Sequence, residues 1–328
     1  MKNPFKKGIR SNSSIGEKGE KPPTRFTNIY SCGSTIPRAP PFGDVADAVE
    51  QHGANSPAAV RAMAAVPVKD AHIPLPHSFW NADASNFELR VGPNYNKKKR
   101  KEPSGPALYD LYGMEIVKSE EGILNEVRDG FEIPDVPGLT DIDTGHPYVP
   151  PMIVLNCNLP CEEPDMLKTS SDGPTYIAVI YLVISPSTLE ELMDLETASP
   201  AVKLFAEWCE KSETDADFRG RFKAMCVLDD VDKLGLPSFI TGYNGKPTLI
   251  TKSGNFTRYP NYIEMSINVH MFAYLAKKGL YTLHKKFPTF VLNVGFTIEA
   301  RDDSQMPEVL LGGCRVLNLD LAKVQVAS

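Results

Sequence analysis

The stretch that decides the fold is Tyr176-Ile-Ala-Val-Ile-Tyr-Leu-Val-Ile184, an unbroken run of apolar, aromatic and β-branched residues. A continuous run of this length is typical of a strand that is buried on both faces, because a buried helix requires a longer segment. The shorter run from Met152 to Leu155 has the same character. Both segments therefore predict central strands of a sheet.

Alternating segments on either side of this run predict half-buried strands. Phe87, Leu89 and Val91 alternate with polar or charged residues, and Gly92-Pro93-Asn94 then ends the pattern. The same alternation predicts strands at 263–269 and 290–298, and an apolar run predicts a last strand at 316–321.

Three helices are expected between these strands. Ser187 followed by Glu190 matches a capping box, Pro200 to Lys211 gives a second helical stretch, and the apolar spacing from 269 to 287 gives a third. Strands mixed with uneven helices favour an α+β fold over a regular βαβ repeat. We expect a largely antiparallel sheet covered by helices, with a flexible N-terminal arm.

The composition divides the chain into three parts. Residues 1–43 are rich in Lys, Ser, Gly and Pro, which predicts a disordered basic arm. Residues 44–79 are expected to be an Ala/Pro-rich linker with short helices at 44–52 and 57–65. Residues 80–325 are expected to form a single α+β domain.

Bulk properties exclude several classes of protein. The net charge of −6 and the pI near 5.6 argue against a general nucleic-acid binder, although residues 1–25 carry seven basic side chains against two acidic ones. No apolar run reaches the roughly 20 residues of a membrane span, and the residues near Met1 lack the hydrophobic stretch of a secretory signal, so we do not expect secretion. The six scattered cysteines are typical of reduced thiols. We expect a cytoplasmic location.

Six short pieces, in order along the chain, resemble a known family. They are Trp80 with Phe87-Glu-Leu-Arg-Val-Gly-Pro-Asn-Tyr95, Ile153-Val-Leu-Asn-Cys-Asn-Leu-Pro160, Phe218-Arg-Gly-Arg-Phe-Lys223, Gly245-Lys-Pro247, Asn261-Tyr-Ile-Glu264, and Met306-Pro-Glu-Val-Leu-Leu-Gly312. The family is the C-terminal domain of the plant enhanced-disease-resistance-two protein, a domain of unknown function.

The resemblance implies an α+β fold and supplies no catalytic residues. In the plant namesake the domain accompanies a pleckstrin-homology module and a lipid-transfer module of the steroidogenic-acute-regulatory type, which implies work at lipid membranes. We expect neither companion module within these 328 residues. Transfer of lipid binding to this domain is therefore an inference by association.

Two basic motifs are candidates for binding anionic lipid headgroups. The first is the run Lys97, Lys98, Lys99, Arg100 and Lys101, which also has the composition of a nuclear-import signal or of a solvated loop, so a nuclear location stays open. The second motif pairs aromatic residues with Arg219, Arg221 and Lys223. Its structural alternative places Phe218 and Phe222 toward the core and the cations outside.

Buried acids give a third group of candidates. Glu264 and Ser266 lie on the polar face of an expected strand, where they either line a cavity or satisfy one another. For Glu264 and Glu308 we favour structural salt bridges with cations such as Arg90 or Arg315.

Metal and cofactor sites are not expected. Asp141, Asp143 and His146 form the most metal-like cluster, but further ligands are missing, and Cys157 with Cys161 has no second pair to complete a zinc site. Nucleophile-elbow, paired-histidine and kinase signatures are absent from the sequence. We therefore predict no cofactor and no catalytic residues.

Three hypotheses about function follow. The first is a non-enzymatic lipid- or membrane-associated binding module whose partner is an anionic lipid surface, peripheral on a membrane. The second is a protein-interaction scaffold that binds its partner through residues 1–70. The third is an enzyme with dispersed catalytic groups.

Overall fold

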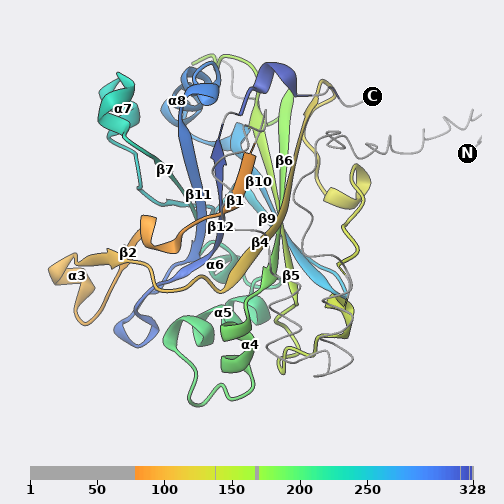
Figure 1. The fold of residues 1–328 in the computed structure, drawn as a ribbon, viewed down its shortest axis with the longest axis vertical. Helices are drawn as coiled ribbons and strands as arrows, with labels where there is room; N and C mark the ends of the chain where they lie inside the picture. The colour runs from red at the N-terminus through yellow and green to blue at the C-terminus, as the bar shows by residue number, and fades with distance from the viewer. Residues whose placement is uncertain (1–77, 137, 167–169, 318, 325, 327–328) are drawn as a thin grey trace, which may run out of the picture.

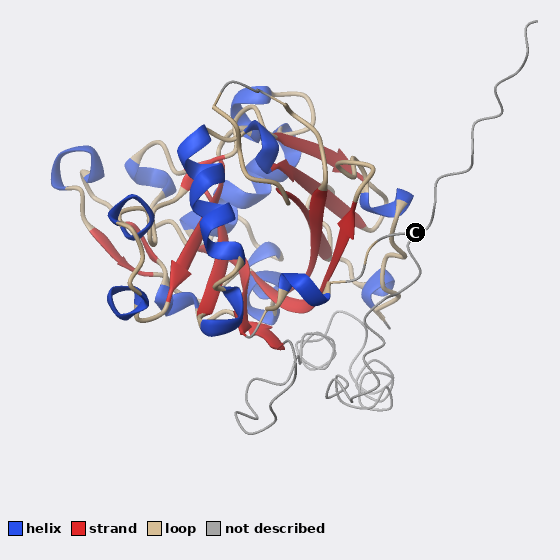
Figure 2. Ribbon diagram, turned by 90° about the horizontal axis from the view of Figure 1, so that it is seen from above, coloured by secondary structure: helices blue, strands red, loops and turns tan. Residues whose placement is uncertain are grey.

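The computed structural model describes residues 78–136, 138–166, 170–317, 319–324 and 326. The arm and the linker predicted for residues 1–77 lie outside the described residues, as does Cys32. The described residues form an α+β fold of two five-stranded sheets and a two-stranded hairpin, with helices around them. Figure 2 shows the two sheets as separate groups of strands.

The strands are numbered in chain order, and their spatial order differs from it. The first sheet runs β1 (Ser78–Asn81), β12 (Leu310–Leu317), β11 (Val291–Ile298), β7 (Phe222–Leu228) and β8 (Thr248–Leu249). The second runs β4 (Tyr109–Ser119), β6 (Thr175–Ile184), β5 (Met152–Pro160), β10 (Tyr262–Asn268) and β9 (Gly254–Arg258). The hairpin comprises β2 (Glu88–Arg90) and β3 (Lys101–Pro103).

The described strand pairs are antiparallel apart from β5 with β10, which is parallel. The largely antiparallel character predicted from the sequence is therefore confirmed. The apolar runs at 152–155 and 176–184 became β5 and β6, which occupy interior positions of the second sheet.

The last strand was predicted at the wrong place. β12 covers Leu310–Leu317 rather than 316–321, because Gly312 and Gly313 break the apolar pattern in its middle. Both glycines are required by close contacts. A Cβ at Gly312 would lie 2.7 Å from Leu182 Cδ1 in the other sheet, and one at Gly313 would lie 2.4 Å from the carbonyl oxygen of Val294.

The helices lie mainly at the two ends of the sheets. They are α3 (Tyr95–Lys98), α4 (Pro186–Leu192), α5 (Pro200–Lys211), α6 (Ala216–Arg219), α7 (Ser238–Thr241) and α8 (Tyr274–His284). Figure 1 places α4 and α5 at the lower end of the molecule and α7 and α8 at the upper end.

Short 3-10 helices connect many of the other elements. They are η1 (Ala84–Asn86), η2 (Val127–Asp129), η3 (Leu139–Asp141), η4 (Val231–Leu234), η5 (Val269–Met271), η6 (Phe287–Thr289), η7 (Asp303–Gln305) and η8 (Leu321–Lys323).

Two helix predictions need correction. The cap of α4 is Ser185, whose hydroxyl accepts the N–H of Thr188, and not Ser187, because Pro186 already occupies the first helical position. The helix expected over 269–287 is divided into η5, α8 and η6. The side chain of Asn268 accepts the N–H of His270 and caps the start of η5, and Phe272, in an extended conformation, ends it.

Aromatic side chains join the two sheets in one core. Trp208, on the buried face of α5, lies with its ring centroid 5.6 Å from Phe222 of β7 and 5.3 Å from Phe256 of β9. Since β7 belongs to the first sheet and β9 to the second, α5 closes the lower end of the space between them. The hairpin β2–β3 has its own small core on the outer side of the first sheet.

Candidate functional site

The hairpin is the most basic projection of the described chain. In Figure 1 it extends from the left side of the molecule, with α3 at its tip. Lys97, Lys98, Lys99 and Lys101 are all exposed, and within the described part of the chain none of them forms an ion pair. Arg100 is also exposed but is paired with Glu102 of β3. The tip therefore presents four uncompensated cations to solvent.

The local sequence explains how the tip turns. Asn94 adopts a left-handed conformation with φ of 66°, which asparagine tolerates better than most residues, and α3 follows it. Lys99 ends α3 with φ of 52°, and its N–H donates to the carbonyl of Tyr95. The N–H of Val91 then donates to the carbonyl of Arg100 and brings the two arms together.

The ring of Tyr95 lies against two cations, Arg90 of β2 and Lys99 of the tip. The Arg90 guanidinium lies 5.1 Å from the centroid of the Tyr95 ring, and Lys99 Nζ lies 5.3 Å from it. Cations at these distances are attracted by the aromatic face. The ring thus holds Lys99 close to the base of the hairpin.

A buried carboxylate fixes the hairpin to the body of the protein. Glu308 Oε1 accepts from Arg90 Nε at 2.8 Å, and Glu308 Oε2 lies 2.7 Å from Lys223 Nζ. Arg90 also donates to the carbonyl of Ala300 at 2.6 Å. Burial alone would raise the pKa of Glu308, but the hydrogen bonds and charges of Arg90 and Lys223 lower it overall. The acid is therefore ionised in the folded protein.

Apolar contacts complete the base of the hairpin. Phe87 and Leu89 are fully buried against Met225 of β7 and Leu310 of β12. The alternation read from the sequence is correct here, since Leu89 faces the protein while Glu88 faces solvent. The hairpin is consequently a rigid support for its basic tip.

The second basic motif does not present a cationic surface. Lys223 was expected outside, but it is 3% exposed and bound to Glu308. Arg221 is 8% exposed and lies 3.9 Å from the centroid of the Phe218 ring. Arg219 donates to the carbonyl of Ser212. Of these three headgroup candidates, Lys223 and Arg221 are thus wrong, because each side chain is enclosed by the fold.

Glu264 and Ser266 do not line an open cavity. Glu264 is 1% exposed and accepts from the N–H of Val127, at 3.0 and 3.1 Å to its two oxygens, and from Ser266 Oγ at 2.8 Å. Asn156 Nδ2 lies 3.3 Å from the same carboxylate. These contacts hold the first turn of η2 against β5 and β10.

Only one of the two expected salt bridges exists. Glu308 pairs with Arg90 as predicted, whereas Arg315 pairs with Asp229 instead. Glu264 has no cationic partner among the described residues, so its expected salt bridge is wrong. Burial raises the pKa of Glu264, against the hydrogen bonds from Ser266, Val127 and Asn156.

Metal-like residues do not assemble into a site in the described part of the chain. No group of three or more His, Cys, Asp or Glu side chains there is arranged to hold a metal ion. Asp143 lines a surface pocket of about 450 Å³ together with Tyr148 and Arg258. Cys157 and Cys161 are free thiols, and burial raises the pKa of each to about 12.

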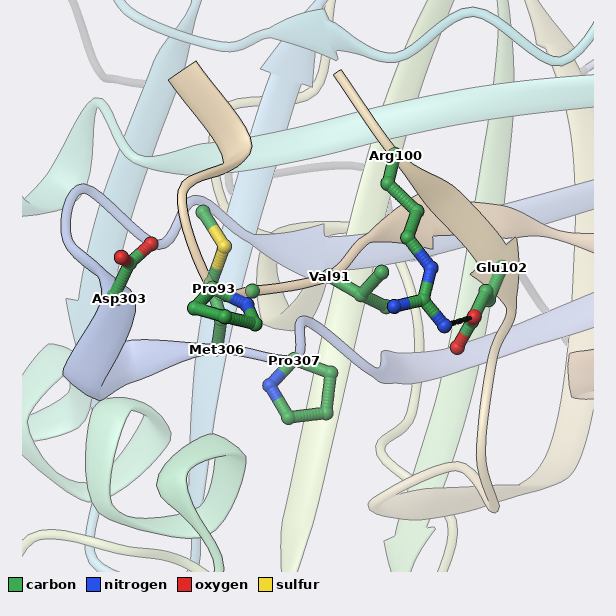
Figure 3. Close-up of a pocket in the computed structure, with 8 residues that line it drawn as sticks. Val91, Pro93, Arg100, Glu102, Asp303, Met306 and Pro307 are labelled. Carbon is green, nitrogen blue, oxygen red and sulfur yellow. Dashed lines mark hydrogen bonds and ion pairs between the residues drawn. The ribbon is translucent and has the colours of Figure 1, made fainter. Parts of the chain in front are cut away.

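A pocket that the sequence did not indicate lies against the hairpin (Figure 3). It has a volume of about 400 Å³ and lies between the start of the tip and the loop that contains η7. Its lining residues are Val91, Gly92, Pro93, Arg100, Glu102, Asp303, Met306 and Pro307. Asp303 Oδ2 accepts the N–H of Asn94 at 2.8 Å and so joins the two walls.

The fold and the site together define a two-sheet α+β domain that carries a rigid, exposed basic hairpin. The chain belongs to the family described as Protein ENHANCED DISEASE RESISTANCE 2, C-terminal, which matches residues 79–320. The family assignment made from the six short pieces is therefore confirmed. No curated protein and no solved structure matches the chain. None of the helices in the described ranges is long and apolar enough to cross a membrane.

Proposed function

We propose that this domain is a non-enzymatic, peripheral membrane-binding module that contacts anionic lipid headgroups with the tip of its basic hairpin. The observation that carries the proposal is the exposure of Lys97, Lys98, Lys99 and Lys101 without acidic partners among the described residues. In a chain of net charge −6, these four lysines form a local cationic surface that an acidic leaflet would attract.

The expected energy is sufficient for reversible binding. Each lysine near an acidic leaflet contributes about 1 kcal/mol, so four contribute roughly 4 kcal/mol at low ionic strength. The rigid support adds to this, because a hairpin held by Glu308 and by Phe87 loses little conformational entropy when it docks. Binding of this kind is weakened by salt.

Vesicle sedimentation tests the proposal. The protein is mixed with phosphatidylcholine vesicles that either contain or lack phosphatidylserine, at low salt. A variant in which Lys97, Lys98, Lys99 and Lys101 are replaced by Gln is expected to bind on the order of 1,000-fold more weakly to the acidic vesicles.

A matched variant controls for the change in net charge. Lys203, Lys233, Lys252 and Lys285 are also exposed and lie outside the hairpin. Their replacement by Gln changes the net charge by the same amount and is expected to leave most of the binding in place. Equal loss in both variants, or no binding by the folded wild-type protein, would contradict the proposal.

The scaffold hypothesis places its partner contacts in residues 1–70, outside the described residues. A partner that is lost on deletion of those residues, with vesicle binding unaffected, would favour the scaffold. The same basic run as a nuclear-import signal predicts instead that the four-lysine variant changes its location in cells without a change in vesicle binding.

A further inference from the structure

One wall of the pocket beside the hairpin carries the carboxylate of Asp303, and the other carries the ion pair of Arg100 with Glu102. Figure 3 shows Asp303 on one side, Arg100 with Glu102 on the other, and Val91, Pro93, Met306 and Pro307 between them. Asp303 forms no ion pair with any described residue, although four lysines lie in the adjoining tip. Its Oδ2 accepts a backbone N–H, while Oδ1 has no hydrogen-bond donor among the described residues.

This distribution disfavours simple ions. A bare phosphate would be repelled by the carboxylate of Asp303, and a simple cation would be repelled by the four lysines of the adjoining tip. A molecule with a positive group and a phosphate, separated by a few methylene groups, matches both walls and the apolar residues between them. A volume of about 400 Å³ lies within the range of small-molecule sites.

The positive group that suits Asp303 is a primary ammonium. Such a group donates hydrogen bonds to a carboxylate, and charge-assisted bonds of this type are strong. A quaternary ammonium would instead require an aromatic face. The nearby ring of Tyr95 already lies against Arg90 and Lys99.

We propose that the pocket binds a phosphate ester that carries a primary ammonium, as in the headgroups of phosphatidylserine and phosphatidylethanolamine. Asp303 binds the ammonium. The phosphate accepts from the exposed lysines and from those N–H groups of Arg100 that do not bind Glu102. The inference rests on the proposed membrane contact and adds the class of lipid that the hairpin selects. Without the pocket, the lysines would respond to the surface charge of the membrane alone.

The test compares two lipids of equal charge. Phosphatidylcholine vesicles receive the same molar fraction of either phosphatidylserine or phosphatidylglycerol, each of which carries one net negative charge. The wild-type protein is expected to bind the phosphatidylserine vesicles about fivefold more tightly, which corresponds to one additional hydrogen-bonded ion pair in a partly exposed site.

Two variants isolate the contribution of Asp303. Asp303→Asn keeps an oxygen acceptor for the N–H of Asn94 and removes only the charge, so the preference for phosphatidylserine is expected to disappear. Glu88→Gln removes one charge from an exposed residue of β2 that does not line the pocket. This variant is expected to keep the preference.

Soluble headgroup compounds show whether the ligand of the pocket is a lipid or a free metabolite. Glycerophosphoserine and phosphoethanolamine are titrated into the protein, with glycerophosphate as the control, and the amide signals of Gly92 and Asp303 are followed by NMR. Shifts that only the two ammonium compounds cause would support binding of an ammonium phosphate ester in the pocket. If such shifts occur while the protein binds both kinds of vesicle equally, the ligand is a free metabolite and not a lipid.

Equal binding of both kinds of vesicle, without such shifts, overturns the inference and leaves the membrane proposal intact. Failure of the folded protein to bind either kind of vesicle overturns the membrane proposal itself.

Discussion

Lys223 Nζ lies 2.7 Å from Glu308 Oε2, and neither side chain is more than 4% exposed. The two residues belong to β7 and to the loop before β12, and Arg90 from the hairpin binds the other oxygen of the same carboxylate. A single buried acid therefore joins three distant segments of the chain.

Removal of this acid is expected to destabilise the fold strongly. Glu308→Gln leaves the ammonium of Lys223 buried without a counter-charge, and loss of one partner from a buried pair typically costs about 3 to 5 kcal/mol. Denaturant unfolding gives the free energy directly. Glu102→Gln, which breaks the exposed pair with Arg100, is expected to change it by less than about 1 kcal/mol. Similar values for the two variants would contradict this account.

Gly295 of β11 is expected to tolerate no side chain. A Cβ there would lie 2.5 Å from Phe87 Cε1 and 2.8 Å from Leu310 Cδ1, both in the core at the base of the hairpin. Gly295→Ala should destabilise the protein by about 1 to 3 kcal/mol through overpacking. Gly105→Ala is the control, since its Cβ would meet only Val309, at 3.9 Å. The thermal unfolding midpoints of the two variants should differ clearly.

The environment of Glu264 predicts a loss of stability as the pH rises. Burial raises its pKa, so the folded state binds this proton more tightly than the unfolded chain. The stabilisation is complete below the unfolded pKa and is lost as the pH rises through the folded pKa. Glu264→Gln keeps a neutral side chain, and its free energy of unfolding should fall less with pH than that of the wild-type protein. Parallel pH profiles would exclude the effect.

The environment of His284 predicts a loss of stability as the pH falls. Its ring lies among Tyr176, Tyr281 and Phe287, and burial lowers its pKa from 6.5 to about 4. Because the folded-state pKa lies below the unfolded value, the stabilisation is complete above about pH 6.5 and is lost as the pH falls toward about 4. His284→Leu should reduce this loss. Above pH 7 the two proteins should give parallel profiles, and a continued difference in slope there would point to another group.

Local sequence patterns were sufficient to predict those elements in which neighbouring residues share the same degree of burial. β6 is buried on both faces, so its apolar run is a direct record of its position. α5 is capped by Ser199 and has Pro200 at its first position, and both signals are local. The basic tip of the hairpin was also readable, because four lysines in five residues have no means of being buried together.

The wrong predictions concern residues whose environment is set by contacts with residues far away in the sequence. Lys223 has the same appearance in the sequence as an exposed lysine, and only Glu308, 85 residues further on, explains its burial. Glu264 was assigned a cation because buried acids usually have one, yet the N–H of Val127 in η2 and the side chains of Ser266 and Asn156 supply hydrogen bonds in its place. The pocket beside Asp303 depends on the approach of the 302–307 loop to the hairpin, which no local pattern records.

β1 pairs with β12, and Ser78 lies opposite Leu317, so the first described strand cannot pair until the last one has been synthesised. The hairpin leaves the ribosome early, directly after β1, but its partners Glu308 and Leu310 are among the last residues of the domain to emerge. Contacts over such a separation form late in folding. The nascent chain therefore exposes the lysines long before the support that orients them exists, and the binding surface is completed only when translation of the domain has ended.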